Sequence, residues 1–159
     1  GFAAQIAEVE VDMVLATVAL HGVGLLVIAR VLHERDLRRA GYRISPFSLE
    51  GAVIASGVAL ALLTLHGVEI WLYAFLFVTL DAIATLPEAV YFSTISYATI
   101  GYNDAPIQEQ WRLLGAIEGV NGTLLMGWSV AFFVTVMARV LPHRRASRRP
   151  ARGDRADAP

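Results

Sequence analysis

Cysteine and lysine are both absent from this chain of 159 residues. Without cysteine there can be no disulfide bond, no thiolate metal site and no cysteine nucleophile. Without lysine, all 13 basic residues are arginine. The sequence also lacks a glycine-rich phosphate loop, a His-Glu zinc motif and any spacing typical of a nucleophile and its base. These absences argue against an enzyme.

Charged residues are also few, and apolar residues are abundant. Only 17% of the residues are charged, whereas 56% are hydrophobic, and the mean hydropathy is +0.55. The apolar residues fall into three long runs, and each run is long enough to cross the ~30 Å hydrocarbon layer of a bilayer. We therefore expect an all-α membrane protein with three transmembrane helices.

The first apolar run extends from Val11 to about Leu32. A cleaved signal peptide is the alternative interpretation, but it would need a basic start and a short apolar core. This run is long, and its start is acidic, with Glu8, Glu10 and Asp12. Small residues in a membrane helix usually mark a packing face, so Gly22 and Gly24 predict contact with a neighbouring helix. We interpret His21 beside them as a hydrogen-bonded interior residue rather than as a ligand.

Arginine is concentrated in two segments. Residues 33–47 form a short basic link with Arg35, Arg38, Arg39 and Arg43, and residues 142–159 form a basic tail with Arg144, Arg145, Arg148, Arg149, Arg152 and Arg155. Short arginine-rich loops stay on the cytoplasmic side of the cell (inner) membrane, which predicts an N-terminus outside and a C-terminus inside. The tail has no apolar period and is expected to be disordered. Its arginines would attract anionic lipids, or serve only as a topology signal.

A short polar stretch between the second and third apolar runs reads Thr99-Ile100-Gly101-Tyr102-Asn103-Asp104. Leu86-Pro87-Glu88, upstream of it, reads as a helix start, with proline and an acid in the first turn. A ladder of carbonyls aimed at one axis needs positions with positive φ, and Gly101 suits such a position. Together these features resemble the pore module of tetrameric potassium channels, which has an outer helix, a re-entrant pore helix, a filter and an inner helix.

The resemblance implies a role for each residue of the polar stretch. The residues that would bind ions in the filter are Thr99, Ile100, Gly101, Tyr102 and Asn103, and the first four would coordinate potassium. Ile100 would also pack behind the filter. No cofactor other than potassium ions is implied. Because one chain supplies one filter loop and four loops surround an ion, the resemblance implies a homotetramer.

Other positions match the family outside the filter itself. Asp104 would support the filter through partners on the pore helix, where Tyr91 and Phe92 stand at the place of the family's aromatic pair. Tyr91 would offer its hydroxyl to Asp104. Gly122 matches the hinge glycine of the inner helix, whose missing Cβ makes it a plausible bending point for gating, although it could equally serve only for packing.

Asn103 departs from the family pattern, which has a second glycine at this position. Asparagine tolerates the left-handed region better than most residues, so the backbone can keep its path. Its polar side chain at the outer ion site leaves two readings open. The first is a passive cation channel selective for potassium, and the alternative is a weakly selective channel for sodium and potassium. A third reading is a non-conducting membrane subunit with the same fold.

Ionisable residues also occur within the second and third apolar runs, and three of them lie at similar predicted depths. His66 and Glu69 lie three residues apart on one face of the second helix, and Glu118 lies near the outer end of the third. Ionisable groups within a membrane are functional candidates by default. A contact among all three would form either a proton-sensitive latch beside the pore helix or a structural hydrogen-bond network. A divalent-metal site is the least favoured interpretation.

Small residues recur every four positions along the third run, at Gly115, Gly119, Thr123, Gly127 and Ala131. Such a stripe permits close helix approach, and it predicts tight packing against pore helices or neighbouring subunits. Asn121 could reach either the ion cavity or the pore helix.

The expected organisation therefore has four parts. Residues 1–32 form an N-terminal transmembrane helix with a short outer segment, and residues 33–47 form the cytoplasmic link. Residues 48–141 form the pore module, with the first helix packed outside it. Residues 142–159 form the tail.

Overall fold

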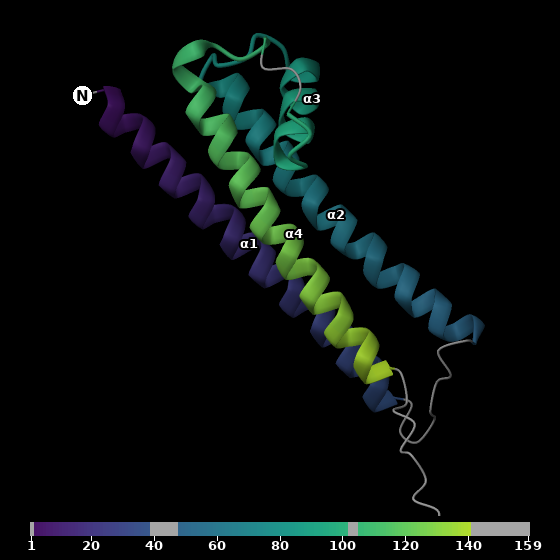
Figure 1. Ribbon diagram of the computed structural model, residues 1–159. Helices are drawn as coiled ribbons and strands as arrows, with labels where there is room; N and C mark the ends of the chain where they lie inside the picture. Colours follow the sequence, from purple (N-terminus) through teal and green to yellow (C-terminus); the bar gives the residue numbers. More distant parts are fainter. Residues whose placement is uncertain (1, 39–47, 102–104, 141–159) are drawn as a thin grey trace, which may run out of the picture.

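The computed structural model describes residues 2–38, 48–101 and 105–140 of the chain. Within these ranges the chain is helical and contains no strand. Its elements are α1 (Phe2–Arg38), α2 (Leu49–Thr79), α3 (Leu86–Tyr97), the 3-10 turn η1 (Glu109–Trp111) and α4 (Arg112–Val140). Figure 1 shows three long helices running alongside one another, with the short α3 at the end where α1 begins.

Three of these helices are long and apolar enough to cross a membrane, namely Ile6–Arg38, Leu49–Thr79 and Glu109–Arg139. The expected all-α architecture with three transmembrane helices is therefore confirmed, and the short α3 lies where the pore helix was predicted. Most of the basic link, the basic tail and the stretch from Tyr102 to Asp104 lie outside the described residues.

The first helix is longer than the sequence suggested, because it continues to Arg38 instead of ending near Leu32. No proline or glycine occurs between Leu32 and Gly41, and glutamate and arginine are good helix formers. Glu34 and Arg38 also lie four residues apart, a spacing that favours an ion pair along a helix. Residues 33–38 are thus helical rather than part of a loop.

Side-chain caps fix where the second and third helices begin. The hydroxyl of Ser48 accepts a hydrogen bond from the Gly51 N–H at 3.1 Å, which caps α2. Thr85 caps α3, where its hydroxyl accepts from the Glu88 N–H at 3.4 Å and donates to the Glu88 carboxylate at 3.0 Å. Pro87 stands in the first turn of α3, where its missing N–H costs no hydrogen bond.

The pore helix α3 packs between α2 and α4, and glycines of α4 allow the close approach. A Cβ added at Gly115 would lie 2.8 Å from Cζ of Phe92, and one at Gly119 would lie 3.0 Å from the Ser96 carbonyl oxygen. A Cβ at Gly122 would lie 2.4 Å from the Tyr97 carbonyl oxygen. The predicted packing of the small-residue stripe against the pore helix is therefore confirmed for its first half.

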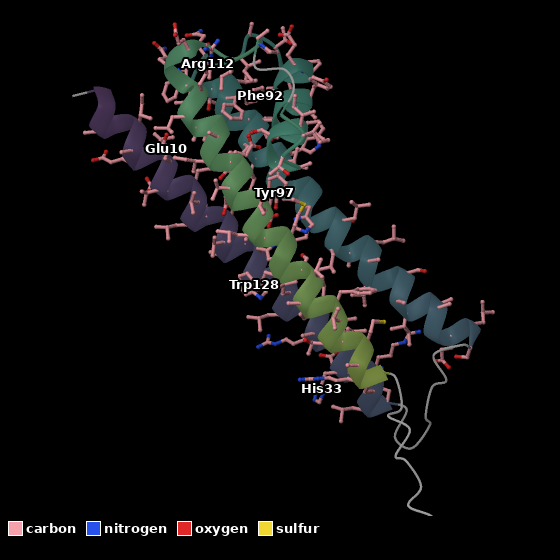
Figure 2. The ribbon with its side chains drawn as sticks, viewed as in Figure 1. Glu10, His33, Phe92, Tyr97, Arg112 and Trp128 are labelled. Carbon is pink, nitrogen blue, oxygen red and sulfur yellow. The ribbon has the colours of Figure 1, made fainter. Side chains whose placement is uncertain are left out.

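Helix α1 packs against α2 and α4 through both small and polar residues. A Cβ at Gly24 would lie 2.6 Å from Leu65, and one at Gly22 would lie 3.4 Å from the ring of Trp128, which Figure 2 labels on α4. The predicted helix contact at these glycines is confirmed. The buried hydroxyl of Thr17 accepts a hydrogen bond from the Asn121 amide at 2.7 Å.

Asn121 differs from the expectation that it would reach the ion cavity or the pore helix. Its amide nitrogen donates to Thr17 of α1 and to the Tyr73 hydroxyl of α2, at 2.7 and 3.0 Å. Successive residues of an α-helix point about 100° apart, so Asn121 faces α1 and α2 while Gly122 faces α3. The amide thus joins three long helices in the interior.

Replacement of Gly122 by alanine is expected to lower stability. The new methyl group meets backbone rather than a flexible side chain, so α3 and α4 must separate, which typically costs ~1–3 kcal/mol. Thermal unfolding in detergent measures the effect. Gly127→Ala is the matched control, because nothing lies within 4 Å of a Cβ there. Equal melting temperatures for both variants would contradict the close packing.

Replacement of Thr17 by valine is expected to loosen α1. Valine keeps the shape but removes the acceptor for the buried Asn121 amide, a loss of ~1–2 kcal/mol. Thr64→Val is the control, since the Thr64 hydroxyl is exposed and bonds only to the Leu60 carbonyl of its own helix among the contacts described. Denaturation in mixed micelles should separate the two variants, and an unchanged Thr17→Val protein would refute the role of this contact.

Candidate functional site

The polar stretch leaves the pore helix through a tight turn. The N–H groups of Ile100 and Gly101 both donate to the Ile95 carbonyl, at 2.8 and 3.0 Å, and the Thr99 N–H donates to the Ser96 carbonyl at 2.9 Å. Thr99 has φ 58° and Gly101 has φ 56°. The positive φ expected at Gly101 is present. The positive φ at Thr99 was not predicted, because a β-branched residue rarely adopts this region.

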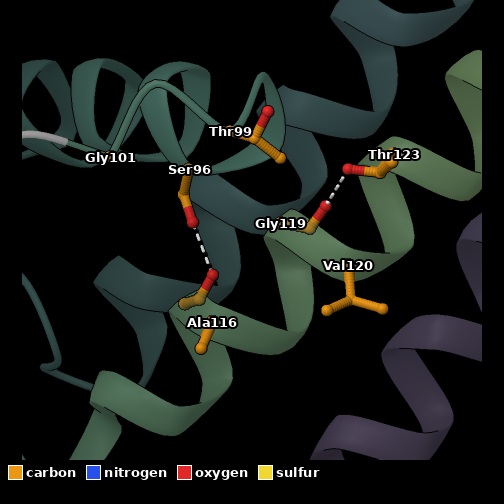
Figure 3. A pocket seen from close by; sticks show the side chains of 8 residues that line it. Ser96, Thr99, Gly101, Ala116, Gly119, Val120 and Thr123 are labelled. Atoms are coloured by element: carbon orange, nitrogen blue, oxygen red, sulfur yellow. Dashed lines mark hydrogen bonds between the residues drawn. The ribbon is translucent and has the colours of Figure 1, made fainter.

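A pocket of about 310 Å³ lies where this turn meets α4 (Figure 3). It is lined by Ser96, Thr99, Gly101, Gly115, Ala116, Gly119, Val120 and Thr123. The Ser96 hydroxyl donates to the Gly115 carbonyl, and the Thr123 hydroxyl donates to the Gly119 carbonyl at 2.9 Å. The pocket thus combines polar oxygen atoms with a face of α4 that has only small or aliphatic side chains.

The rest of the predicted filter is only partly described. Thr99, Ile100 and Gly101 lie at the end of the turn, whereas Tyr102, Asn103 and Asp104 lie outside the described residues. Ile100 was expected to pack behind the filter, but its side chain is 55% exposed. The expectation concerned the assembled filter, so it stays a prediction.

The aromatic pair of the pore helix divides between two environments. Phe92 is buried and stands edge-on to Phe77 of α2, with ring centroids 5.3 Å apart (Figure 2 labels Phe92). Tyr91 is 45% exposed on another side of α3. Phe92 therefore belongs to the core that holds α3, while Tyr91 faces away from that core.

A buried polar cluster lies below the turn, at the last residue of α3. We call it the Glu69 cluster, and its members are His21, His66, Glu69, Tyr97 and Ser129. The Glu69 carboxylate bonds to His21 Nδ1 at 2.9 Å, to His66 Nδ1 at 3.2 Å and to the Tyr97 hydroxyl. The Ser129 hydroxyl lies 3.0 Å from His66 Nε2 and 3.3 Å from His21 Nε2. All four helices thus contribute to one network.

Burial of this cluster is almost complete. His21 and Glu69 have no exposed surface, and the His66 side chain is 14% exposed. The alternatives of a proton-sensitive latch and a structural network both required the contact between His66 and Glu69, which the structure contains. His21 is a hydrogen-bonded interior residue, as expected, and it connects α1 directly to Glu69.

Glu118 does not join the cluster, contrary to the expected three-way contact. Its carboxylate accepts a hydrogen bond from the buried Ser93 hydroxyl, which also lies 2.9 Å from the Ile70 carbonyl oxygen. Ser93 and Tyr97 are one helical turn apart on α3, and each meets a different acid. Glu118 and Glu69 therefore contact the same face of α3 about one helical turn apart, through different side chains. The second oxygen of Glu118 is buried without a described partner.

The ligand atoms of His21, His66 and Glu69 gather within 4.8 Å of one another, which is the geometry that a metal site would need. The two carboxylate oxygens, however, face different rings, and each ring nitrogen already faces a partner within the chain. A divalent ion would also leave a net positive charge in the membrane interior, which is costly. The arrangement is that of a hydrogen-bond network rather than a ligand shell.

Sequence reasoning paired His66 with Glu69 through their spacing, but it missed three members of the cluster. His21, Tyr97 and Ser129 lie on other helices, and their meeting depends on how each helix is rotated about its axis. A shared depth was the available signal, since each long apolar run has a polar side chain near this level.

Comparison with protein families gives one match. A model of the ion channel family matches residues 53–139, which include most of α2, all of α3 and nearly all of α4. No curated protein and no solved structure matched the chain. The matched region is more than half of the chain, it contains the pore helix and its turn, and α1 precedes it as an additional helix. The chain therefore belongs to the ion channel family, in its two-transmembrane, pore-loop branch.

Proposed function

We propose that the chain is the subunit of a passive, potassium-selective cation channel, in which four copies surround a filter made by Thr99 to Asn103. The observation that carries this proposal is the turn after α3, where Thr99 and Gly101 both have positive φ and the N–H groups fold back onto the helix end. A backbone with alternating left-handed positions can aim successive carbonyls toward one axis, as an ion filter requires.

The orientation of α3 supports a cationic cargo. The C-terminal end of a helix carries a partial negative charge, from the carbonyls of its last turn. The turn with Thr99 to Gly101 starts directly at this end. Cations near the turn would therefore be favoured over anions, independently of which cation passes.

Several features of the single chain support assembly around an axis. Ile100 is largely exposed, and the pocket beside Thr99 opens along a face of α4 where Val120 is 64% exposed. One loop can offer carbonyls from one side only, whereas an ion must be surrounded. Four chains related by closed symmetry would complete the coordination and cover these surfaces.

Potassium is the proposed ion because of the Thr-Ile-Gly-Tyr string, and weak selectivity is the competing proposal because of Asn103. The distribution of arginine supports a filter that faces outward, with the N-terminus outside and the basic tail in the cytoplasm. The gate would lie at the cytoplasmic end of α4, and Gly122, beside the end of α3, would provide the bend if it acts as a hinge.

Ion flux into liposomes tests this proposal. We expect potassium-driven flux through the purified, reconstituted protein and at least tenfold less flux with sodium. Gly101→Ala should abolish the potassium flux, because a side chain is strained at φ 56°. Gly57→Ala is the matched control, since nothing lies within 4 Å of its Cβ and it sits within the regular helix α2.

The other outcomes decide between the remaining readings. Equal flux of both ions would replace the proposal with the weakly selective channel. A verified tetramer without flux at any pH on either side would point to a non-conducting subunit. Equal loss of flux in Gly101→Ala and Gly57→Ala would show that the effect does not come from the filter.

A further inference from the structure

We infer that the Glu69 cluster holds one proton shared between His21 and His66, and that this proton links α1 to the end of the pore helix. The part of the inference that concerns conduction rests on the proposed function. The proton itself, and its effect on the end of α3, do not depend on conduction.

Both imidazoles bridge the same two partners. Each Nδ1 faces one oxygen of Glu69, at 2.9 Å for His21 and 3.2 Å for His66, and each Nε2 faces the single hydroxyl of Ser129, at 3.3 and 3.0 Å. The two rings lie with centroids 5.2 Å apart. The contacts form a closed ring of polar atoms that joins α1, α2 and α4, and Tyr97 of α3 attaches to it at Glu69.

Hydrogen atoms in this ring can be counted from the chemistry of each group. If both histidines are neutral and donate from Nδ1 to Glu69, both Nε2 atoms need a donor, but Ser129 has only one hydroxyl hydrogen. One Nε2 would then face an oxygen without a hydrogen between them. One additional proton on either Nε2 completes the ring, because that nitrogen donates to Ser129 while Ser129 donates to the other ring.

Charge favours the same protonation state. An ionised Glu69 with two neutral histidines would leave a net negative charge in a fully buried site. One imidazolium makes the cluster neutral overall, whereas two would leave a positive charge and a hydroxyl hydrogen without an acceptor. The state with a single shared proton is therefore the one in which both the hydrogen bonds and the charge are balanced.

Loss of this proton would change the hydrogen bonds of the Tyr97 hydroxyl. The Tyr97 hydroxyl bonds to Glu69 and also lies 2.9 Å from His66 Nδ1. When both rings are neutral, His66 can donate from Nε2 to Ser129 only if its Nδ1 carries no hydrogen. The bare Nδ1 is then an acceptor, and it competes with Glu69 for the hydrogen of the Tyr97 hydroxyl. Tyr97 is the last residue of α3 and lies two residues before Thr99, so this competition acts next to the filter turn.

Other titratable groups near the cluster are few among the described residues. Helix α2 contributes Glu69, α3 contributes Tyr97, and α4 contributes Ser129, which does not titrate. Tyr73 and Glu118 lie outside the cluster, where they bond to Asn121 and Ser93. Helix α1 contributes only His21 itself. The two histidines are therefore the groups in the cluster whose ring nitrogens face both Glu69 and Ser129 and can share one proton.

Nitrogen-15 NMR of labelled histidine in nanodiscs tests the proton count. A background protein with His33→Gln and His143→Gln leaves His21 and His66 as the labelled rings, and His33 is exposed at the far end of α1. We expect one imidazolium per chain at pH 7.5, where free histidine is mostly neutral. Ser129→Ala should reduce the imidazolium signal at least threefold. Two neutral rings, or two imidazolium rings, at pH 7.5 would overturn the inference.

Amide hydrogen exchange tests the link to α3 without any need for ion flux. At the pH where the imidazolium signal disappears, the protection factors of the Ile100 and Gly101 amides should fall at least tenfold, since both amides bond to the end of α3. The Val58 amide within α2 is the reference and should not change. Unchanged protection at Ile100 and Gly101 would refute the link, even if the proton is present.

Potassium flux over the same pH range tests the consequence for conduction. We expect flux to fall at least fivefold as the proton leaves, with a slope of one proton. His33→Gln is the matched control and should follow the native pH profile, whereas His21→Gln should remove the step. If no variant conducts, the proposed function fails while the NMR and exchange results still decide the proton and the link. A step retained in His21→Gln would contradict the inference.

Discussion

The arrangement of the helices depends on the carboxylate of Glu69, which is fully buried within a membrane-spanning helix. No water in the bilayer interior can solvate Glu69, so its oxygens must find donors within the chain. They find them on α1, α2 and α3, in His21, His66 and Tyr97. Hydrogen bonds of about 3 Å tolerate little sliding or rotation of a helix. The position of this one acid therefore fixes the register of the helices around it.

Close approach of the helices is what makes such bonds possible. Glycines stand where α1 meets Leu65 and where α4 meets the end of α3, and side chains at Gly24 or Gly122 would keep these helices apart. The additional helix α1 is thereby part of the polar interior, because Thr17 and His21 point into it. The glycines allow the short distances between helices that the buried hydrogen bonds require, and the hydrogen bonds hold the helices at those distances.

The sequence predicted those features that depend on composition and local pattern. Three apolar runs predicted three spans, the Leu86-Pro87-Glu88 start predicted the pore helix, and Gly101 predicted a positive φ. Prediction from the sequence failed where the rotation of a helix about its axis decides which side chains form hydrogen bonds. Glu118 was grouped with His66 by depth, yet it bonds to Ser93, one turn of α3 before the tyrosine that bonds to Glu69. His21 and Asn121 have no local pattern that reveals their partners, since these lie on other helices.

The backbone of Thr99 shows how the Glu69 cluster and the turn after α3 are structurally connected. A β-branched residue with positive φ costs ~1–3 kcal/mol and persists only where its surroundings hold it. The turn itself is held by hydrogen bonds to the last carbonyls of α3, and α3 is held at the same end by Tyr97. Tyr97 in turn depends on Glu69, whose charge is matched by α1 and α2. The strained backbone at Thr99 is thus supported by a chain of contacts that starts on α1, the helix farthest from it in sequence.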